Sequence, residues 1–308
     1  MSIASTSRST VAYIAESTFG ETPATPTFKK LRRTNGNLTT KKTTVVSDEV
    51  QVDRNVRDEL QVAQDVSGSY DLELSYGTLD DILEGVALSA WSSDVLKNGT
   101  TGKSFTFEET VDVGGSNTYS RFPGCYIDQL SLTVSSRALV KGSVSIMGLN
   151  ETLDTAIISG ATYTAANSNV IETGVTVASL SVAGLSPAPK VKSIAVTIKN
   201  NLRIRDTVGS LYTEEFGMGQ CDVTGTLEAY FESNALYQKV LDHGSGSISF
   251  TIGSVTTKKY TFTMPLCRFL DGAKKLGGKN DDVMVSIPFR ATYDATSGAS
   301  ITITRAVA

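Results

Sequence analysis

The stretch VSGSYDLELSYGTLDDILEGV, residues 66–86, alternates polar and apolar residues for about seven positions and then changes to helical spacing. The stretch VTGTLEAYFESNALYQKVLDH, residues 223–243, follows the same plan, and both open on V-[ST]-G-[ST]. Alternation with a period of two predicts a strand, and apolar residues three or four apart predict a helix. The sequence therefore predicts a strand that runs into a short helix, written twice in one chain.

The rest of the chain has the pattern of a β-rich protein. Alternating runs separated by Gly-containing turns predict further strands within residues 103–148, 192–201, 247–264 and 281–308. Residues 39–66 are long and carry charges of both signs, which predicts an exposed loop or a long hairpin. We therefore expect a mainly β fold.

The two halves can be compared position by position. With an offset of 157 Gly68 falls on Gly225, and with an offset of 142 Cys125 falls on Cys267. Matching element order favours duplication over chance similarity between strand-rich segments. We expect an extended N-terminal arm over 1–35, a first β unit over 36–150, a Ser/Thr/Gly-rich connector or insertion over 151–190, and a second β unit over 191–308.

Composition limits the function of the protein. The chain has 308 residues, 40% hydrophobic residues, 19% charged residues and a net charge of −4, so it lacks the basic excess of a nucleic-acid-binding protein. We expect no membrane span and no secretory signal, because neither a run of about 20 apolar residues nor an apolar N-terminal core is present. Three cysteines without CxxC spacing favour buried free thiols over a metal site or a disulfide framework.

No pattern in the sequence predicts catalysis. His243 is the one histidine, and a histidine next to a helix end is more often a cap or a surface residue than a base. The acids of LGGKNDDV, residues 276–283, lack the spacing of a calcium loop and fit a solvated turn better. We predict no enzyme activity, no cofactor and no metal, and interpret the protein as a structural or binding protein.

The two repeated strands share an acidic phase. In a strand, alternate side chains point to opposite faces. Tyr70, Leu72 and Leu74 share one face of the first copy, and its other face carries Asp71 and Glu73. In the second copy Glu228 and Glu232 occupy the polar face. Neither polar face contains lysine or arginine, which distinguishes it from an ordinary solvated face.

The chain resembles the tail tube, or major tail, proteins of long flexible-tailed, siphovirus-type bacteriophages. The resemblance is carried by IAESTFGETPATPTFKKLR at residues 14–32, by 66–86, and by VKSIAVTIKNNLRIRDTVGS at 191–210 with the 223–243 stretch. It implies β-sandwich or barrel units, each flanked by a short helix, that close into rings and stack into a hollow conduit for DNA ejection. Related tubes have six units per ring, so two units per chain would favour a trimer over a hexamer.

The resemblance also implies partners and surfaces. The partners are other copies of the chain, the tape measure, terminator and distal tail proteins, and double-stranded DNA that passes without specific binding. The resemblance places the protein in the virion tail, which is assembled in the host cytoplasm, and implies no membrane partner. We expect Asp71, Glu73, Glu228 and Glu232 to face an acidic lumen. Contacts between rings are expected at these residues: Phe19, Pro23, Pro26, Asp48, Glu49, Asp53, Arg54 and Arg57.

Two alternatives remain. A tail terminator or a baseplate hub is a related virion part that the sequence separates poorly from a tube protein. A bacterial surface β-sandwich protein that binds carbohydrate would be expected to have a secretion signal and exposed aromatic clusters, and the chain has a single tryptophan, Trp91.

Overall fold

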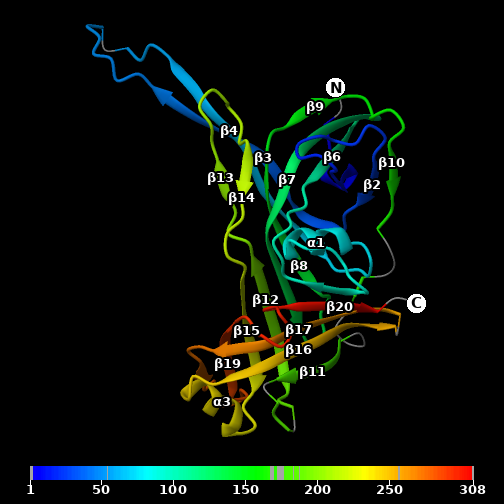
Figure 1. Cartoon of the computed structure of the whole chain (residues 1–308), viewed down its shortest axis with the longest axis vertical. Coiled ribbons are helices and arrows are strands. Elements are labelled where there is room, and N and C mark those ends of the chain that lie inside the picture. The colour runs from blue at the N-terminus through cyan, green and yellow to red at the C-terminus, as the bar shows by residue number, and fades with distance from the viewer. Residues whose placement is uncertain are drawn as a thin grey trace.

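The chain is mainly β, as its alternation predicts. A computed structural model describes residues 3–53, 55–166, 170–171, 177–182, 184–186, 188–255 and 257–306. Two short α-helices and one 3-10 turn, η1 (Thr6–Arg8), complete the regular elements of this part of the chain. Figure 1 shows an elongated body from which one long hairpin projects.

A long antiparallel sheet runs through the middle of the molecule (Figure 1). In order across it lie β3 (Arg33–Val46), β4 (Glu59–Glu73), β8 (Lys141–Gly148), β7 (Ser116–Ser135), β12 (Val191–Lys199), β15 (Asp222–Tyr230) and β19 (Met284–Ala291). The far side of β19 pairs with β18 (Ala273–Lys275) and with the end of β17 (Lys258–Phe269). We call this set, from β3 to β18, the long sheet. Within the described residues, β3 and β18 each pair with a strand on one side only.

The first half of the chain adds a second layer. Its strands are β1 (Ser9–Ala15), β6 (Phe105–Val113), β2 (Thr27–Lys30), β9 (Thr152–Asp154) and β10 (Thr162–Thr164). The strand β7 belongs to both layers, because its first half pairs with β6 and its second half with β8 and β12. Gly124, with φ at 65°, lies where β7 passes from one layer to the other.

The second half has a corresponding layer. There β16 (Ser245–Val255) pairs with β17 and with β11 (Val177–Val182). The last strand, β20 (Thr302–Ala306), pairs with β17 and also with β5 (Val95–Lys97) from the first half. The side chains of Arg305 and Tyr260 reinforce this connection, since both bond to Asp80 at the start of the first helix.

Both predicted helices are confirmed. Helix α1 (Asp80–Ala87) begins with two acidic residues, which its dipole favours, and buries Ile82, Leu83 and Val86. Helix α3 (Asn234–Leu241) is capped by Ser233, whose hydroxyl accepts a hydrogen bond from the N–H of Ala235. Each helix follows the long-sheet strand that the repeated pattern predicted, β4 and β15 respectively.

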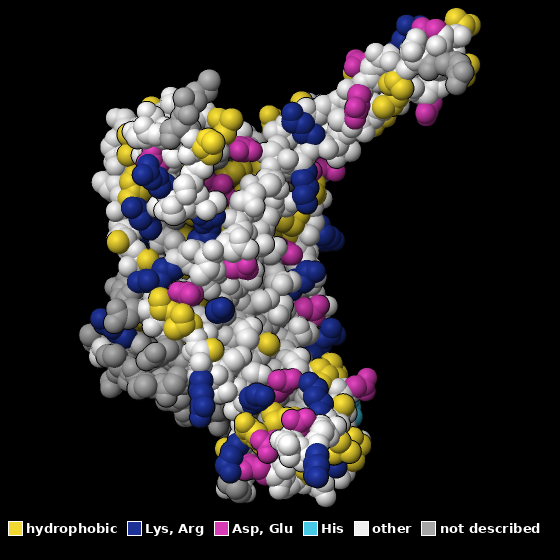
Figure 2. Space-filling model, turned by 180° about the vertical axis from the view of Figure 1, so that it is seen from behind, with side chains coloured by type: hydrophobic (Ala, Val, Ile, Leu, Met, Phe, Trp, Pro, Cys, Tyr) yellow, Lys and Arg dark blue, Asp and Glu magenta, His cyan; other side chains and the backbone are white. Residues whose placement is uncertain are grey.

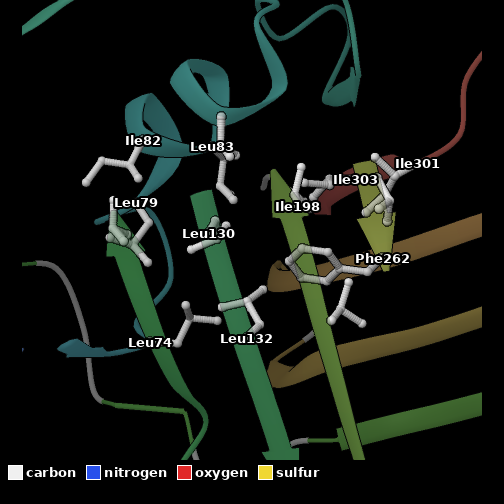
Figure 3. Packing of buried hydrophobic residues seen from close by; sticks show 14 of the residues in the cluster. Leu74, Leu79, Ile82, Leu83, Leu130, Leu132, Ile198, Phe262, Ile301 and Ile303 are labelled. Atoms are coloured by element: carbon white, nitrogen blue, oxygen red, sulfur yellow. The ribbon is translucent and has the colours of Figure 1, made fainter. Parts of the chain in front are cut away.

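One hydrophobic core spans both halves of the chain. In Figure 3, Leu83 of α1 points toward Leu130 of β7, and Leu79 and Ile82 belong to the same cluster. Ile198 of β12, Phe262 of β17 and the two isoleucines of the C-terminal segment continue the same cluster. Burial of such side chains stabilises the fold by about 1.5–3 kcal/mol each. The core therefore holds the two halves together.

The segments expected outside the two β units contain strands. Residues 9–15 and 27–30 of the expected N-terminal arm form β1 and β2, and Val11, Tyr13 and Phe28 are buried. Residues 152–154, 162–164 and 177–182 of the expected connector form β9, β10 and β11.

Candidate functional site

The face of the long sheet that points away from the core is rich in hydroxyl groups. The alternation of buried and accessible residues along the strands separates this face from the buried one. We call it the hydroxyl face. Its serines and threonines are Thr39, Ser67, Ser69, Ser131, Thr133, Ser135, Ser143, Ser145, Ser193, Thr197, Thr224, Thr226 and Ser286. The strand register brings them side by side, as where Ser131 and Thr197 share a hydrogen bond of 3.1 Å.

Two of the predicted lumen residues lie on this face beside β8. Asp71 is half-buried opposite Ser143 and lines a shallow pocket with Lys141. Glu73 is also half-buried and lies directly opposite Lys141 in the register. The neighbouring strand thus places a cation beside the acidic end of β4.

The other two predicted residues form ion pairs. The carboxylate of Glu228 accepts a hydrogen bond from Lys275 Nζ at 2.8 Å and from Ser193 Oγ at 3.2 Å. The Lys275 contact holds the pKa of Glu228 below its usual range. Glu232 lies beyond the end of β15, where Lys190 Nζ approaches its carboxylate to 2.7 Å and lowers its pKa. The structure therefore brings Asp71, Glu73 and Glu228 onto one face and places Glu232 at its margin.

The hydroxyl face carries charges of both signs. Its acidic side chains are Asp65, Asp71, Glu73, Asp222 and Glu228. Its basic side chains are Lys41, Lys141, Lys199, Arg268, Lys275 and Arg290. Most of these cations stand on strands next to β4 and β15, so a single strand's sequence could not reveal them. Alternating Ser and Thr in 129–135 and 191–199 is the signal that could have identified this face.

The residues expected between rings fall into two groups. Asp48, Glu49, Asp53 and Arg57 lie in the connection between β3 and β4, at the exposed end of the projecting hairpin (Figures 1 and 2). Val50 and Val52 of the same connection are fully exposed, at 97% and 102%. Arg54 lies outside the described residues.

The second group lies on the body. Phe19 packs edge-on against Phe216, with ring centroids 6.3 Å apart, and Pro26 is buried. Pro23 is half-buried in the same segment. The structure does not bring these three residues to the hairpin.

A second hairpin supports the projecting one. It consists of β13 (Arg203–Arg205) and β14 (Glu215–Gly217) and extends alongside β3 and β4 (Figure 1). The N–H of Gln64 donates to the carbonyl oxygen of Leu211 at 2.8 Å, and Thr213 Oγ1 donates to Asp65 at 2.7 Å. Because both hairpins start at the long sheet, they form one projection.

The described side chains offer little for catalysis or metal binding. No cluster of three or more His, Cys, Asp or Glu side chains in this part of the chain has the arrangement of a metal site. Burial raises the pKa of the Cys221 thiol to about 11 and that of Cys267 to about 12, so both are poor nucleophiles. None of the helices among the described residues is long and apolar enough to span a membrane.

Comparison with models of known protein families gives a match. A family model described as phage tail tube protein matches residues 6–291, nearly the whole chain. No curated protein matches the sequence.

Proposed function

The chain belongs to the phage tail tube protein family and is a structural protein of the virion tail, and from this premise we propose that its copies close into rings through the ends of the long sheet and stack into a passive conduit for DNA. The observation that carries the proposal is that the long sheet is open at β3 and at β18 within the described residues. Unpaired strand edges invite pairing with another chain, and a closed ring leaves no such edge.

We also propose that the chain contains two tandem β units, each with a flanking helix, as the sequence repeat suggests. The strands β3, β4, β8 and β7 pair in that order in the first half, and β12, β15, β19 and β17 do so in the second. The outer pairs correspond as well, because β1 pairs with β6 and β11 with β16.

Two cysteines support the same duplication. Cys125 Sγ donates to the carbonyl oxygen of Phe122 three residues earlier, and Cys267 Sγ donates in the same way to that of Met264. Both lie next to a register shift in their hairpins. With two units per chain, three chains supply six units around a ring, and a trimer is favoured over a hexamer.

The hydroxyl face is the proposed lining of the lumen, with Asp71, Glu73 and Glu228 toward the DNA. Each unpaired cation that faces DNA can hold a phosphate by releasing counterions, which would slow transit. Hydroxyl groups carry no charge, and at least one lysine of this face is already paired with a carboxylate, Lys275 with Glu228. This lining differs from the acidic lumen first expected, because neutral groups and balanced charges, rather than net negative charge, would keep DNA from adhering.

The projecting hairpin is the proposed contact between stacked rings. Its exposed valines leave apolar surface in solvent, and such surface favours contact with a protein partner. The ends of the assembled tube would contact the tape measure, terminator and distal tail proteins in a tail assembled in the host cytoplasm. The siphovirus type is part of this proposal.

The lumen proposal is tested by adding cations to the hydroxyl face without breaking an ion pair. Ser69→Lys and Thr224→Lys each place a lysine on the hydroxyl face, and Ser69→Gln and Thr224→Gln are matched uncharged controls. Virions with the lysine variants should assemble tails but eject DNA more slowly, whereas the glutamine variants should eject normally. Equal ejection rates for both sets, measured by DNA release from purified virions, would refute the proposed lining.

A further inference from the structure

The chain already contains one junction between its two halves. The second half of β7 pairs with β12, with Thr133 opposite Ala195, Leu132 opposite Val196 and Ser131 opposite Thr197 (Figure 1). This pairing makes the long sheet continuous from β3 to β18. It shows how one proposed unit attaches to the next when both belong to the same chain.

The strands at the two open ends correspond to the strands of this junction. Gly68 of β4 lies opposite Leu38 of β3, as Gly225 of β15 lies opposite Val196 of β12. Aligning the two glycines makes Leu38 the counterpart of Val196, and Asn37 that of Ala195.

The other open end gives an equally direct correspondence. Gly142 of β8 lies opposite Leu132 of β7, and Val285 of β19 lies opposite Lys274 of β18. Gly142 and Val285 occupy matching places, because each stands four residues before the partner of the aligned glycine, Ile146 or Phe289. Lys274 is therefore the counterpart of Leu132, and Lys275 that of Thr133.

One further residue distinguishes the open edge from the paired one. On β6, Glu109 lies opposite Val11 of β1 and accepts a hydrogen bond from the backbone N–H of Leu38 at 3.0 Å. The hydroxyl group of Tyr70 donates to the same carboxylate oxygen at 2.7 Å. The Glu109 carboxylate thus accepts a hydrogen bond from a backbone N–H of β3 that, among the described residues, no neighbouring strand accepts.

The counterpart of Glu109 in the second half is apolar. Phe107 and Ile248 occupy matching places after the register shifts of β6 and β16, so Phe250 corresponds to Glu109. Phe250 is buried and stacks on Phe262, with ring centroids 5.2 Å apart. The strand of the second half that corresponds to β3 is β12, and β12 is already paired with β7. An acid therefore stands where the edge is open, and a phenyl ring where it is covered.

We propose that β3 of one chain pairs with β18 of a second copy in the register of the internal junction, and that Glu109 caps this edge until the second copy arrives. In this register Asn37 lies opposite Lys275, Leu38 opposite Lys274 and Thr39 opposite Ala273. This proposal rests on the proposed ring and specifies which strands meet between neighbouring copies in it. When this register is continued by two residues, Asp271 of the second copy comes near Lys41, so opposite charges meet on the hydroxyl face. When the strand docks, its backbone takes the N–H of Leu38 and the Glu109 carboxylate leaves it.

The register is tested by disulfide cross-linking of assembled tubes. Asn37→Cys with Lys275→Cys places two thiols directly opposite each other on one face, within the separation that a disulfide requires. Lys41→Cys with Lys275→Cys is the matched control, displaced by four residues. After mild oxidation, the first pair should give covalent multimers on a non-reducing gel, ending at the closed ring, and the control should remain monomeric.

The outcomes separate the register from the function. Tubes visible by electron microscopy without cross-linking of the first pair, or with cross-linking of the control pair, would overturn the register and leave the tube intact. Failure of the unmodified protein to assemble with its tail initiation proteins would overturn the proposed function and the register with it.

The cap is tested by the critical concentration for assembly. Glu109→Phe installs the residue of the second half and frees the N–H of Leu38, so assembly should begin at an about tenfold lower concentration. Glu109→Gln retains an acceptor oxygen and should assemble like the unmodified chain. An unchanged or higher critical concentration for a folded Glu109→Phe variant, with Glu109→Gln also unchanged, would refute the capping role.

Discussion

Glu228 on β15 and Lys275 on β18 form an ion pair of 2.8 Å across the intervening strand β19. The strand β18 has only three residues, all exposed, so few other contacts hold it. One of these is the stacking of the Lys274 ammonium over the ring of Phe231, 4.4 Å from its centroid. The ion pair thus helps to keep in place the strand that we propose to dock on the next copy.

Replacement of the lysine should release the acid. In Lys275→Met the pKa of Glu228 should rise toward its ordinary value, because the cation that lowers it is gone. In the unmodified chain, a carboxyl group with a lowered pKa stabilises the fold at pH values above its ordinary pKa, and this stabilisation is lost when the group is protonated. The attachment of β18 should therefore weaken as the pH falls below about 4.3. Carbon-13 NMR of glutamate side chains measures the shift. Lys190→Met is the control, since it should move Glu232 instead; an unmoved Glu228 in Lys275→Met would contradict the assignment.

A buried ion pair in the first half should be costly to break on one side. The carboxylate of Glu108 is fully buried and contacts Arg121 Nε at 2.7 Å, and the same guanidinium reaches Asp154 at 2.9 Å. Arg121→Met leaves the Glu108 carboxylate without its cation and should lower the free energy of unfolding by about 3–5 kcal/mol.

Removing both charges should cost less than removing one. In Glu108→Gln with Arg121→Met no buried charge remains unpaired, and about half of the lost stability should return. Urea denaturation followed by circular dichroism measures both variants. A double variant no more stable than Arg121→Met would show that packing, rather than the unpaired charge, causes the loss.

The three cysteines should resist thiol reagents in the folded chain. Burial raises the pKa of Cys221 to about 11, so at pH 8 only about one thiol in a thousand is ionised. Cys125 and Cys267 are fully buried, and burial raises the pKa of both thiols. A colorimetric thiol assay at pH 8 should detect no fast-reacting group before denaturation and three after it. A fast thiol in the folded chain would contradict the packing around these residues.

Local pattern was sufficient to predict several elements of the fold. The helical spacing of Leu79, Ile82, Leu83 and Val86 predicted α1, and the alternation within 247–264 predicted the β16–β17 hairpin. The mixed charges of 39–66 predicted an exposed loop or hairpin, and a hairpin is found. These features depend on residues close together in the chain, which is why the sequence reveals them.

The surfaces depend on pairings between distant residues and could not be predicted in the same way. Lys141 reaches the acidic end of β4, and Lys275 reaches Glu228, through strand registers that no single strand encodes. The contact between Glu109 and Leu38 joins residues 71 positions apart. The strand β1 was also not predicted, because its short apolar run, Val11 to Ala15, does not alternate, and the strands that cover it, β2 and β6, come from other parts of the chain.

The most direct test of the account is a cryo-electron microscopy reconstruction of the assembled tube at a resolution that traces the strands. We predict three chains in each ring, six successive sets of long-sheet strands around the lumen, and Ser69 and Thr224 pointing toward the central channel. A ring of six chains, or a long sheet whose Ser69 and Thr224 point to the outer wall, would contradict it.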